Sequence, residues 1–369
     1  MNILVVHACQ INAFPPVRNL IEILLRNRHH VTVITRDDSG LYLDNTDNLK
    51  CIVLPEASRN KILAGFSYLK KLRILRRTVK EEMKSNDILW TTTDSTVRDL
   101  GDMVFNYRHI MQLMELTEDV PLIPGQNIIK SNIKKYAKQA YKVVVPEYNR
   151  AHIQKTWWDL KVVPSILPNK MTLKDVGEVP EDVNMVLEQV KKESRKIILY
   201  QGGFWADRDL ELYAQAVEKI NDEYCLYIMG RDMPYRKELC DKHPSIKYIP
   251  YIKPPFHLLV TKMAYIGLLP YKAAKNQHYS MLNALYCAPN KIYEYSACGL
   301  PMIGSDVPGL FYSFASNDIG YVCKKESTEE ILDIIKNIET RYDQMVLNCL
   351  DYYEQTDMDQ IVHEILGEI

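Results

Sequence analysis

The sequence predicts an α/β fold made of two doubly wound domains in tandem. The chain has 369 residues, which is too long for one ordinary hydrophobic core. Short apolar runs alternate with amphipathic stretches from end to end, which indicates repeated strand–helix–strand units. The apolar runs are continuous rather than alternating, and this is typical of parallel strands covered on both faces.

The first series of elements occupies the amino-terminal part of the chain. Residues 2–7 form a compact apolar run, residues 17–28 are amphipathic, and residues 30–35 are apolar again. This order predicts a strand, a helix and a second strand that pairs parallel with the first. Further strands are predicted at residues 51–54, 88–91, 109–113 and 142–145.

A change in character separates this series from a second one. Residues 163–193 contain three prolines and show weak periodicity, which predicts a linker. The predicted domains are residues 1–168 and 169–345, with residues 346–369 as a carboxy-terminal helix that can pack back on the first domain. Ligands of open α/β sheets bind beyond the carboxyl ends of the strands, so we expect the site in a cleft between the domains. Strands of the second series are predicted at residues 197–200, 225–229, 246–249, 264–269 and 302–304, followed by a helical tail from residue 328.

Composition excludes several classes of function. A formal net charge of −1 argues against a general nucleic-acid binder, which would be strongly basic. No segment reaches the ~18 consecutive apolar residues expected of a spanning helix, and the first residues predict a strand rather than a secretory signal. The eight cysteines are scattered without a CxxC pair, which favours reduced thiols in a cytoplasmic protein over disulfides or a zinc site.

Residues 199–210 (LYQGGFWADRDL) predict a strand, a glycine turn and the start of a helix. Gly202 and Gly203 let a ligand approach the backbone closely, and a helix amino end supplies N–H groups that suit a phosphate. Arg208 can add a bidentate phosphate contact. The alternative is a plain strand-to-helix turn with a surface arginine, and this segment alone favours neither.

Residues 288–309 (APNKIYEYSACGLPMIGSDVPG) give a stronger signal. Asn290 predicts a helix cap directly after Pro289. Lys291 and Glu294 are three residues apart on the predicted helix and share a face. A cap, a lysine and a carboxylate on one face can hold a nucleotide diphosphate and its ribose diol together. The alternative, which is the commoner fate of a Lys-x-x-Glu pair, is an exposed ion pair.

These two segments resemble the donor domain of GT-B-fold retaining glycosyltransferases, the group known as glycosyltransferase family 4. Residues 294–303 (EYSACGLPMI) are similar to the end of its Glu-x7-Glu element. Residues 266–271 (IGLLPY) resemble the strand before that element, and residues 163–169 (VPSILPN) resemble the hinge entry. The resemblance covers nearly the whole chain and is most specific at residues 288–309. It implies a fold of two Rossmann-like domains that face a cleft.

The resemblance also implies roles for individual residues. Glu294 would bind the ribose hydroxyls of a nucleotide-sugar donor, and Arg208 would contact the diphosphate. Lys291 and the backbone near Asn290 would line the phosphate and sugar side. The resembled family needs no metal, so no metal or other cofactor is expected, and Asp207-Arg-Asp209 is interpreted as a helix start in which the carboxylates favour the dipole.

Two positions depart from the family pattern. Tyr286 stands where the first Glu of Glu-x7-Glu is expected, which leaves the donor sugar open, and Asn283 is a candidate replacement. Gly203 stands where the family has an arginine. The diphosphate would then rely more on backbone N–H groups and on Arg208.

The first domain offers two carboxylates at predicted strand ends. Glu115 follows strand 109–113, at a place where many relatives carry a His-Glu pair, and it is the first candidate for a polar group near the reacting sugar. Asp94, after strand 88–91, is the second. His109 is interpreted as a structural strand residue. The loop at residues 8–15 has no glycine, which argues against a GxGxxG dinucleotide fingerprint.

The stretch at residues 58–84 is strongly basic, with nine Lys or Arg against two Glu. Apolar residues recur there at helical spacing, so a basic amphipathic helix is predicted. Such a helix suits an anionic membrane surface, where each Lys or Arg contributes about 1 kcal/mol. The alternative is a solvated helix whose apolar stripe faces its own sheet. The expected membrane or acceptor patch consists of Lys70, Lys71, Arg73, Arg76 and Arg77.

Together these observations favour a cytoplasmic glycosyltransferase, peripheral on the inner membrane face. It would move a sugar with retention from a UDP- or GDP-sugar to a saccharide acceptor, expected to be lipid-linked, in bacterial surface polysaccharide synthesis. One alternative is a sugar-nucleotide epimerase on a similar fold, which needs acid–base groups that the sparse histidines do not clearly supply. Another is a non-catalytic glycosyltransferase-like partner subunit, which the departures at Tyr286 and Gly203 keep open.

Overall fold

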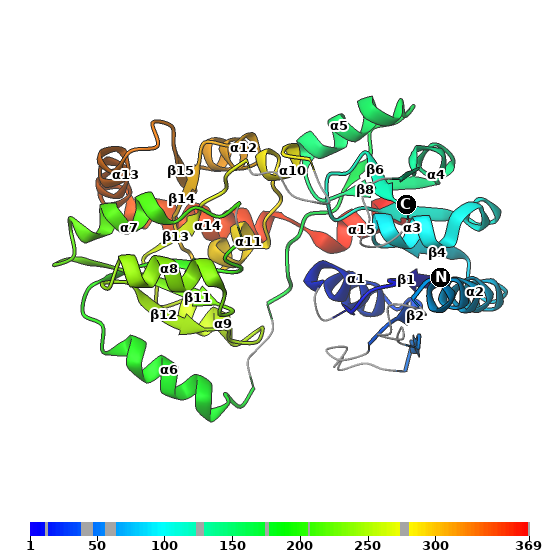
Figure 1. Cartoon of the computed structure of the whole chain (residues 1–369), viewed down its shortest axis with the longest axis horizontal. Coiled ribbons are helices and arrows are strands. Elements are labelled where there is room, and N and C mark those ends of the chain that lie inside the picture. The colour runs from blue at the N-terminus through cyan, green and yellow to red at the C-terminus, as the bar shows by residue number, and fades with distance from the viewer. Residues whose placement is uncertain are drawn as a thin grey trace. The chain divides into compact units, whose positions relative to one another are not determined.

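The computed structural model shows two compact units, each built on its own sheet (Figure 1). Unit 1 comprises residues 1–169, 276–283 and 357–369, and unit 2 comprises residues 170–275 and 284–356. No helix among the described residues is long and apolar enough to cross a membrane. The structure describes residues 1–11, 14–37, 47–55, 64–122, 129–173, 177–205, 207–273 and 280–367.

Unit 1 contains a parallel sheet of seven strands in the order β3-β2-β1-β4-β5-β8-β9. Ile3 pairs with Val31 on one side and with Ile88 on the other, so β1 lies at the centre. The strand order reverses between β1 and β4, which makes this the topological switch point of the sheet. The strands are β1 (Asn2–Val6), β2 (His30–Thr35), β3 (Leu49–Val53), β4 (Ile88–Thr91), β5 (His109–Gln112), β8 (Lys142–Val145) and β9 (Ser165–Ile166).

Helices cover both faces of this sheet because both sets of strand side chains are apolar. Ile3 and Val5 lie in the core formed with α1 and α15, and Leu4 and Val6 lie in the core on the other face. A short antiparallel pair, β6 (Asp119–Pro121) with β7 (Lys130–Asn132), was not predicted. The helices of unit 1 are α1 (Pro15–Arg26), α2 (Ala64–Glu82), α3 (Asp94–Leu100), a 3-10 turn (Gly101–Asn106), α4 (Lys134–Gln139), α5 (Tyr148–Trp158) and α15 (Met358–Leu366).

Unit 2 contains a parallel sheet of six strands in the order β12-β11-β10-β13-β14-β15. Ile198 pairs with Leu226 and with Ile266, so β10 is central and the switch point lies between β10 and β13. The strands are β10 (Lys196–Gln201), β11 (Tyr224–Gly230), β12 (Lys247–Pro250), β13 (Ile266–Leu269), β14 (Met302–Ser305) and β15 (Gly320–Cys323). The helices are α6 (Glu181–Lys191), α7 (Glu211–Glu218), α8 (Pro234–Lys242), α9 (His257–Thr261), α11 (Asn290–Ala297), α12 (Pro308–Asn317), α13 (Thr328–Thr340) and α14 (Tyr342–Gln355), while α10 (Leu282–Leu285) lies where the chain passes from unit 1 to unit 2.

The predicted linker at residues 163–193 contains a short strand and a helix. Ser165–Ile166 form β9 beside β8, and Glu181–Lys191 form α6. Val183, Leu187 and Val190 are buried at i, i+4 and i+7, so this helix packs its apolar stripe against unit 2. The prolines masked this short helical period, since Pro180 lies just outside the helix as its amino-terminal cap residue.

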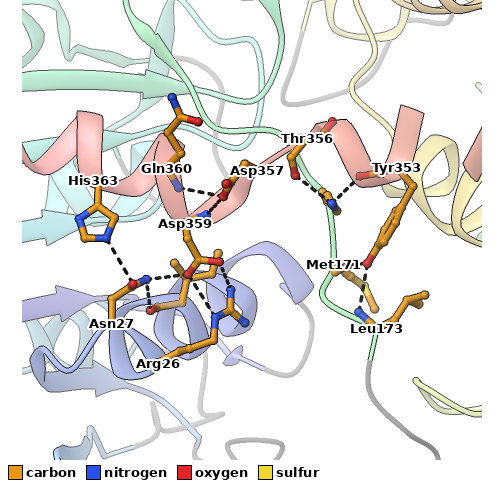
Figure 2. Close-up of polar contacts among 12 residues, drawn as sticks. Arg26, Asn27, Met171, Leu173, Tyr353, Thr356, Asp357, Asp359, Gln360 and His363 are labelled. Carbon is orange, nitrogen blue, oxygen red and sulfur yellow. Dashed lines mark hydrogen bonds and ion pairs between the residues drawn. The ribbon is translucent and has the colours of Figure 1, made fainter. Parts of the chain in front are cut away.

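The segment expected as one helix at residues 346–369 breaks into two. Helix α14 ends at Gln355 in unit 2, and α15 packs on α1 in unit 1. Arg26 donates two hydrogen bonds to Asp359, and the Asn27 amide donates to the same carboxylate at 2.6 Å (Figure 2). Asp357 accepts from the first N–H groups of α15 and caps it, so the break is a capped helix start.

Within unit 2, the end of α14 is fastened to the first residues of that unit (Figure 2). The Lys170 ammonium donates to the carbonyls of Tyr353 and Thr356, at 2.5 and 2.8 Å. The Tyr353 hydroxyl donates to the Met171 carbonyl at 2.7 Å and accepts from the Leu173 N–H at 3.1 Å. Charge-assisted bonds of this kind stabilise helix ends, because the last carbonyls of a helix lack partners of their own.

Two buried histidines of unit 1 should make its stability depend on pH. His7 and His109 are 0% and 2% exposed, and burial lowers their pKa values to about 4 and about 3. Between the ordinary pKa of 6.5 and these values, the unfolded chain binds protons that the folded unit does not, so stability falls as the pH falls. Each histidine contributes a slope of about 1.4 kcal/mol per pH unit in that window.

We expect His109→Gln to flatten the decline of the urea unfolding midpoint between pH 7 and pH 5. His30→Gln, a change at an exposed histidine of β2, serves as the control and should keep the wild-type slope. An unchanged slope in His109→Gln would show that the pKa of His109 is the same in the folded and the unfolded chain.

Candidate functional site

The switch point of unit 2 lies where the chain leaves β10 and β13. The loop after β10 runs beside the end of β13, because the Asp209 N–H donates to the Pro270 carbonyl and Arg208 pairs with Tyr271 in a short bridge. The carboxyl ends of strands at such a point leave a crevice that the adjoining loops and helix ends surround. Residues of the two predicted segments, 199–210 and 288–309, meet here.

Gly202 and Gly203 are glycines for two different reasons. Gly202 has φ +138°, a left-handed value that other residues rarely adopt, and a Cβ there would lie 3.0 Å from the Lys291 Nζ. At Gly203 a Cβ would lie 2.3 Å from Nε1 of Trp205. The indole therefore lies against the glycine backbone, and its other surfaces face solvent, since Trp205 is 61% exposed.

Helix α11 begins with uncapped N–H groups. Pro289 is the N-cap and supplies no side-chain hydrogen bond, whereas Asn290 is the first helical residue. The prediction that Asn290 caps the helix was wrong, because the cap position falls one residue earlier. Free N–H groups and the helix dipole give this end partial positive charge, which suits an anion.

Lys291 extends this positive end into the site. No hydrogen bond or ion pair joins its ammonium to another described residue, and the nearest groups are the Gly202 backbone and the Tyr200 ring, whose centroid is 5.8 Å away. Burial, followed by the neighbouring Arg208 cation, lowers the pKa of Lys291 to about 8. A half-buried ammonium without a partner is costly in the free fold, and a bound anion would relieve that cost.

Arg208 is held by its surroundings as well as by charge. Its guanidinium carbon lies 3.8 Å from the centre of the Tyr271 ring, a cation–π contact, and Nη1 pairs with the Asp207 carboxylate at 2.5 Å. The side chain is only 16% exposed. Arg208 is therefore not the free surface arginine of the alternative interpretation.

Glu294 and Lys291 share a face of α11, yet they do not form the expected ion pair with one another. The Gln201 amide donates to Glu294 Oε2 at 2.6 Å, and the His257 Nε2 lies 3.6 Å from Oε1. Burial acts to raise the pKa of Glu294, but His257, Lys291 and the Gln201 hydrogen bond outweigh it and hold that pKa below its usual range. The carboxylate is ionised, 12% exposed and available to accept hydroxyl hydrogen bonds.

Sequence reasoning missed four residues at this site: Gln201, Trp205, His257 and Thr261. Gln201 is the last residue of β10 and is buried. His257 and Thr261 are also buried, and they lie on one face of the five-residue helix α9. The only signal in the sequence was a polar residue after a continuous apolar strand, which marks a strand end at the ligand edge. Helix α9 is too short for its period to reveal a buried histidine.

Tyr286, which stands at the place of the missing carboxylate, and Asn283, its candidate replacement, make contacts of their own. Asn283 accepts from the Leu116 N–H and donates to Glu115 at 2.8 Å, so both ends of its amide are engaged within unit 1. It is therefore not a free stand-in for the missing carboxylate. Tyr286 is half-buried, and the backbone that follows it packs against Gly309 at the start of α12.

Glu115 and Asp94 lie at the carboxyl ends of neighbouring strands of unit 1. Asp94 begins α3 directly after β4, and Glu115 follows β5. Burial, and then the charge of Glu115, raises the pKa of Asp94. The Glu115 carboxylate accepts from Asn283 and lies 4.0 Å from the buried Arg150. The structure thus brings both predicted carboxylates to one edge and couples them electrically.

The basic patch on α2 divides into structural and free cations. Arg76 donates to the Asp99 carbonyl at 2.8 Å, which ties it to α3. Lys71 is half-buried and lines a small cavity together with apolar residues and with Arg36 and Asp99. Lys70, Arg73 and Arg77 are exposed at i, i+3 and i+7, and Lys80 continues the row. None of these four has an acidic partner among the described residues, and part of the predicted stretch, residues 56–63, lies outside them.

Comparison with known proteins finds one family model that matches part of the chain and one fold that matches all of it. Residues 195–340 match the family model described as Glycosyl transferases group 1. No curated protein matches the chain. The structure is similar to a sucrose-phosphate synthase from Thermosynechococcus elongatus, with TM-score 0.69 and 15% identity over 100% of this chain and 98% of that one.

Two further solved structures are similar over almost the whole chain. One is HepE from Anabaena in complex with UDP-glucose, with TM-score 0.67 and 11% identity over 100% of both chains. The other is WaaG, a glycosyltransferase involved in lipopolysaccharide biosynthesis, with TM-score 0.60 and 15% identity over 98% of both chains. At these identities the similarity shows the fold, which is GT-B with two Rossmann-like domains.

Proposed function

We propose that this chain, a glycosyltransferase by its group 1 domain at residues 195–340, transfers a sugar from a UDP-sugar to a saccharide acceptor. The observation that carries the proposal is the separation of charge along α11. An unpartnered cation, Lys291, lies one turn from an ionised carboxylate, Glu294, at the switch point of unit 2. A nucleotide diphosphate has the complementary layout, with phosphate charges on one side and a ribose diol on the other.

The proposed roles follow from the chemistry of each group. Lys291, Arg208 and the N–H groups at the start of α11 neutralise the diphosphate as it becomes the leaving group. Gly202 and Gly203 let the backbone approach it closely. Glu294 accepts hydrogen bonds from the ribose hydroxyls. Uracil is the proposed base of the donor. Two of the similar structures, HepE with UDP-glucose and MnaA from S. aureus with UDP, hold a uridine nucleotide.

We also propose that transfer is metal-independent and retains configuration at the sugar carbon. The two carboxylates that resemble a metal-binding pair are already engaged. Asp207 pairs with Arg208, and Asp209 accepts from Lys272 at 3.0 Å and from the Glu211 N–H at 3.1 Å. Positively charged side chains, and not a metal ion, would then balance the charge of the diphosphate. Retention rests on the family resemblance, and Glu115 and Asp94 are the candidates for acid–base contact with the reacting sugar.

The acceptor is proposed to be lipid-linked, as an intermediate of bacterial surface polysaccharide at the cytoplasmic face of the membrane. The support is the unpaired cation row of α2, Lys70, Arg73, Arg77 and Lys80, beside Leu69, which is 63% exposed. An anionic leaflet attracts such a row and an exposed leucine can enter the interface. WaaG, which acts in lipopolysaccharide biosynthesis, has a similar fold.

Donor binding can be followed through Trp205, the only tryptophan of unit 2. We expect titration with UDP, with UDP-sugars and with GDP to change its fluorescence for the uridine ligands, equally with EDTA and with Mg²⁺. Glu294→Ala should weaken UDP binding at least tenfold, because a buried charged acceptor of the ribose hydroxyls is lost. Trp205→Phe controls for the source of the signal.

The outcomes separate the alternatives. Binding of GDP instead of UDP would reject the uridine assignment, and no binding of either would reject the donor site. UDP binding without release of UDP from any UDP-sugar and acceptor would favour a non-catalytic partner subunit.

The titration of Lys291 gives a second prediction. The ammonium is the form that binds a diphosphate, and its pKa of about 8 means that this form is lost as the pH rises through 8. We expect the affinity for UDP, measured by calorimetry, to fall between pH 7 and pH 9. Lys291→Arg should remove this decline because a guanidinium stays charged. The same decline in Lys291→Arg would assign the titration to another group.

Membrane attachment gives a third prediction. The triple variant Lys70→Glu, Arg73→Glu and Arg77→Glu should lose sedimentation with vesicles rich in anionic lipid, because the row then repels the surface. Wild-type binding should weaken with added salt, since screening acts within about 10 Å at 0.1 M. Lys191→Glu, a change at an exposed lysine of α6 in unit 2, serves as control. Equal binding by the triple variant would remove α2 from the proposed membrane surface.

A further inference from the structure

We propose that Thr261 and Gln201 are positioning residues that set the orientation of the Glu294 carboxylate and thereby the grip on the donor ribose. The inference rests on the proposed function, because Glu294 contacts the ribose there. It adds to that function that the buried hydroxyl of Thr261, which does not itself contact the ribose, affects how tightly the site binds the donor. The chain of contacts runs from α9 through the end of β10 to α11.

The first step is the direction of the Gln201 amide. The Thr261 hydroxyl donates to Gln201 Oε1 at 2.6 Å, and Gln201 Nε2 donates to Glu294 Oε2 at 2.6 Å. The carboxylate only accepts hydrogen bonds, so the amide turns its nitrogen toward Glu294, and the hydroxyl, which also lies 3.2 Å from the His257 carbonyl, donates to the amide oxygen and holds the amide in that direction. A turned amide would place its oxygen against a carboxylate oxygen, where two acceptors repel one another.

The second step is the fixing of both Glu294 oxygens from one short helix. Thr261 and His257 are four residues apart on α9 and lie on the same face. Thr261 acts on Oε2 through Gln201, and the His257 Nε2 lies 3.6 Å from Oε1. That distance is an ion-pair contact rather than a hydrogen bond. The carboxylate plane is thus defined from two sides.

The third step is that stability does not account for these residues. Thr261 is 0% exposed, Gln201 3% and His257 8%, and the His257 Nδ1 is buried without a partner. Buried polar groups are costly unless they are satisfied, and the unpartnered His257 Nδ1 leaves such a cost in the fold. A polar chain that ends on one carboxylate is explained by what that carboxylate must do.

The fourth step is the effect on ligand binding. An ionised carboxylate held in one orientation need not reorganise when two vicinal hydroxyls approach it. Contacts to the ribose are the same before and during sugar transfer, so they change the KM for the donor and leave kcat unchanged. A loss of orientation should therefore appear as weaker UDP binding and a higher KM.

The test replaces the hydroxyl by a methyl group of nearly the same size, Thr261→Val. We expect the affinity for UDP to fall roughly tenfold, the size expected for a weakened bond to a charged group, and the KM for the UDP-sugar to rise with kcat unchanged. Thr261→Ser keeps the hydroxyl and should restore both values. Thr328→Val, at another buried threonine of unit 2 on α13, is the matched control and should bind UDP normally.

The decisive comparison uses 2′,3′-dideoxy-UDP, which lacks the diol. If Thr261 acts through Glu294, Thr261→Val and the wild type should bind this nucleotide equally. An equal loss for both nucleotides would mean general distortion and would overturn the proposal, as would normal UDP binding by Thr261→Val. Should that variant unfold, Gln201→Met takes its place with the same expectations.

Failure of the proposed function is distinguishable from failure of this inference. If wild-type protein does not bind UDP, or if Glu294→Ala binds it normally, the donor site itself is wrong. If both behave as expected and only Thr261→Val fails to discriminate the diol, the positioning role alone is wrong.

Discussion

The donor-side unit depends on keeping two opposite charges of one helix apart. Lys291 and Glu294 lie on the same face of α11, and an isolated helix would pair them. In the fold each contacts a different residue at the end of β10. Lys291 lies over the Gly202 backbone after β10, and Glu294 is held by Gln201 and faces His257 of α9. Lys291 and Glu294 therefore do not form an ion pair with one another, and under the proposed function each contacts the ligand.

Keeping the Lys291 ammonium buried without an ion pair costs free energy. Burial without a partner lowers the pKa of an ammonium, and the pKa of Lys291 falls to about 8. The packing that imposes this comes from the sheet, because the β10 and β13 ends meet at the switch point and α11 begins beside them. Apolar contacts on both faces of the sheet stabilise the fold and offset the cost of burying the Lys291 charge.

Much of this fold can be predicted from the sequence because continuous apolar strands are a strong signal. The strands at residues 30–35, 88–91 and 142–145 have the predicted bounds. The short elements β6, β7, β9 and β15 lack a full period of their own, and α6 was hidden by nearby prolines. The four-residue strands at 88–91 and 142–145 are nearly continuous apolar runs, whereas β6, β7 and β9 have only two or three residues and β15 is buried only at its two ends.

The candidate site was predicted less completely, for a physical reason. Lys291, Glu294, Arg208 and the glycines stand in motifs along the chain, whereas Gln201, His257 and Thr261 matter only through contacts made at a distance in sequence. Spacing could not show that the Lys-x-x-Glu pair is divided rather than joined. The cap was misplaced by one residue for a related reason, since Pro289 and Asn290 both satisfy the local pattern and only the helix geometry separates them.

The two units carry opposite electrostatic character at their ligand edges. In unit 2 the groups proposed to face the reaction are cations, Lys291 with Arg208 nearby, which suits a leaving diphosphate. In unit 1 they are carboxylates, and the pKa of Asp94 is raised by burial and by Glu115. A departing diphosphate needs positive charge and an incoming hydroxyl needs a proton acceptor, so under the proposed function the two edges would serve the two halves of one transfer.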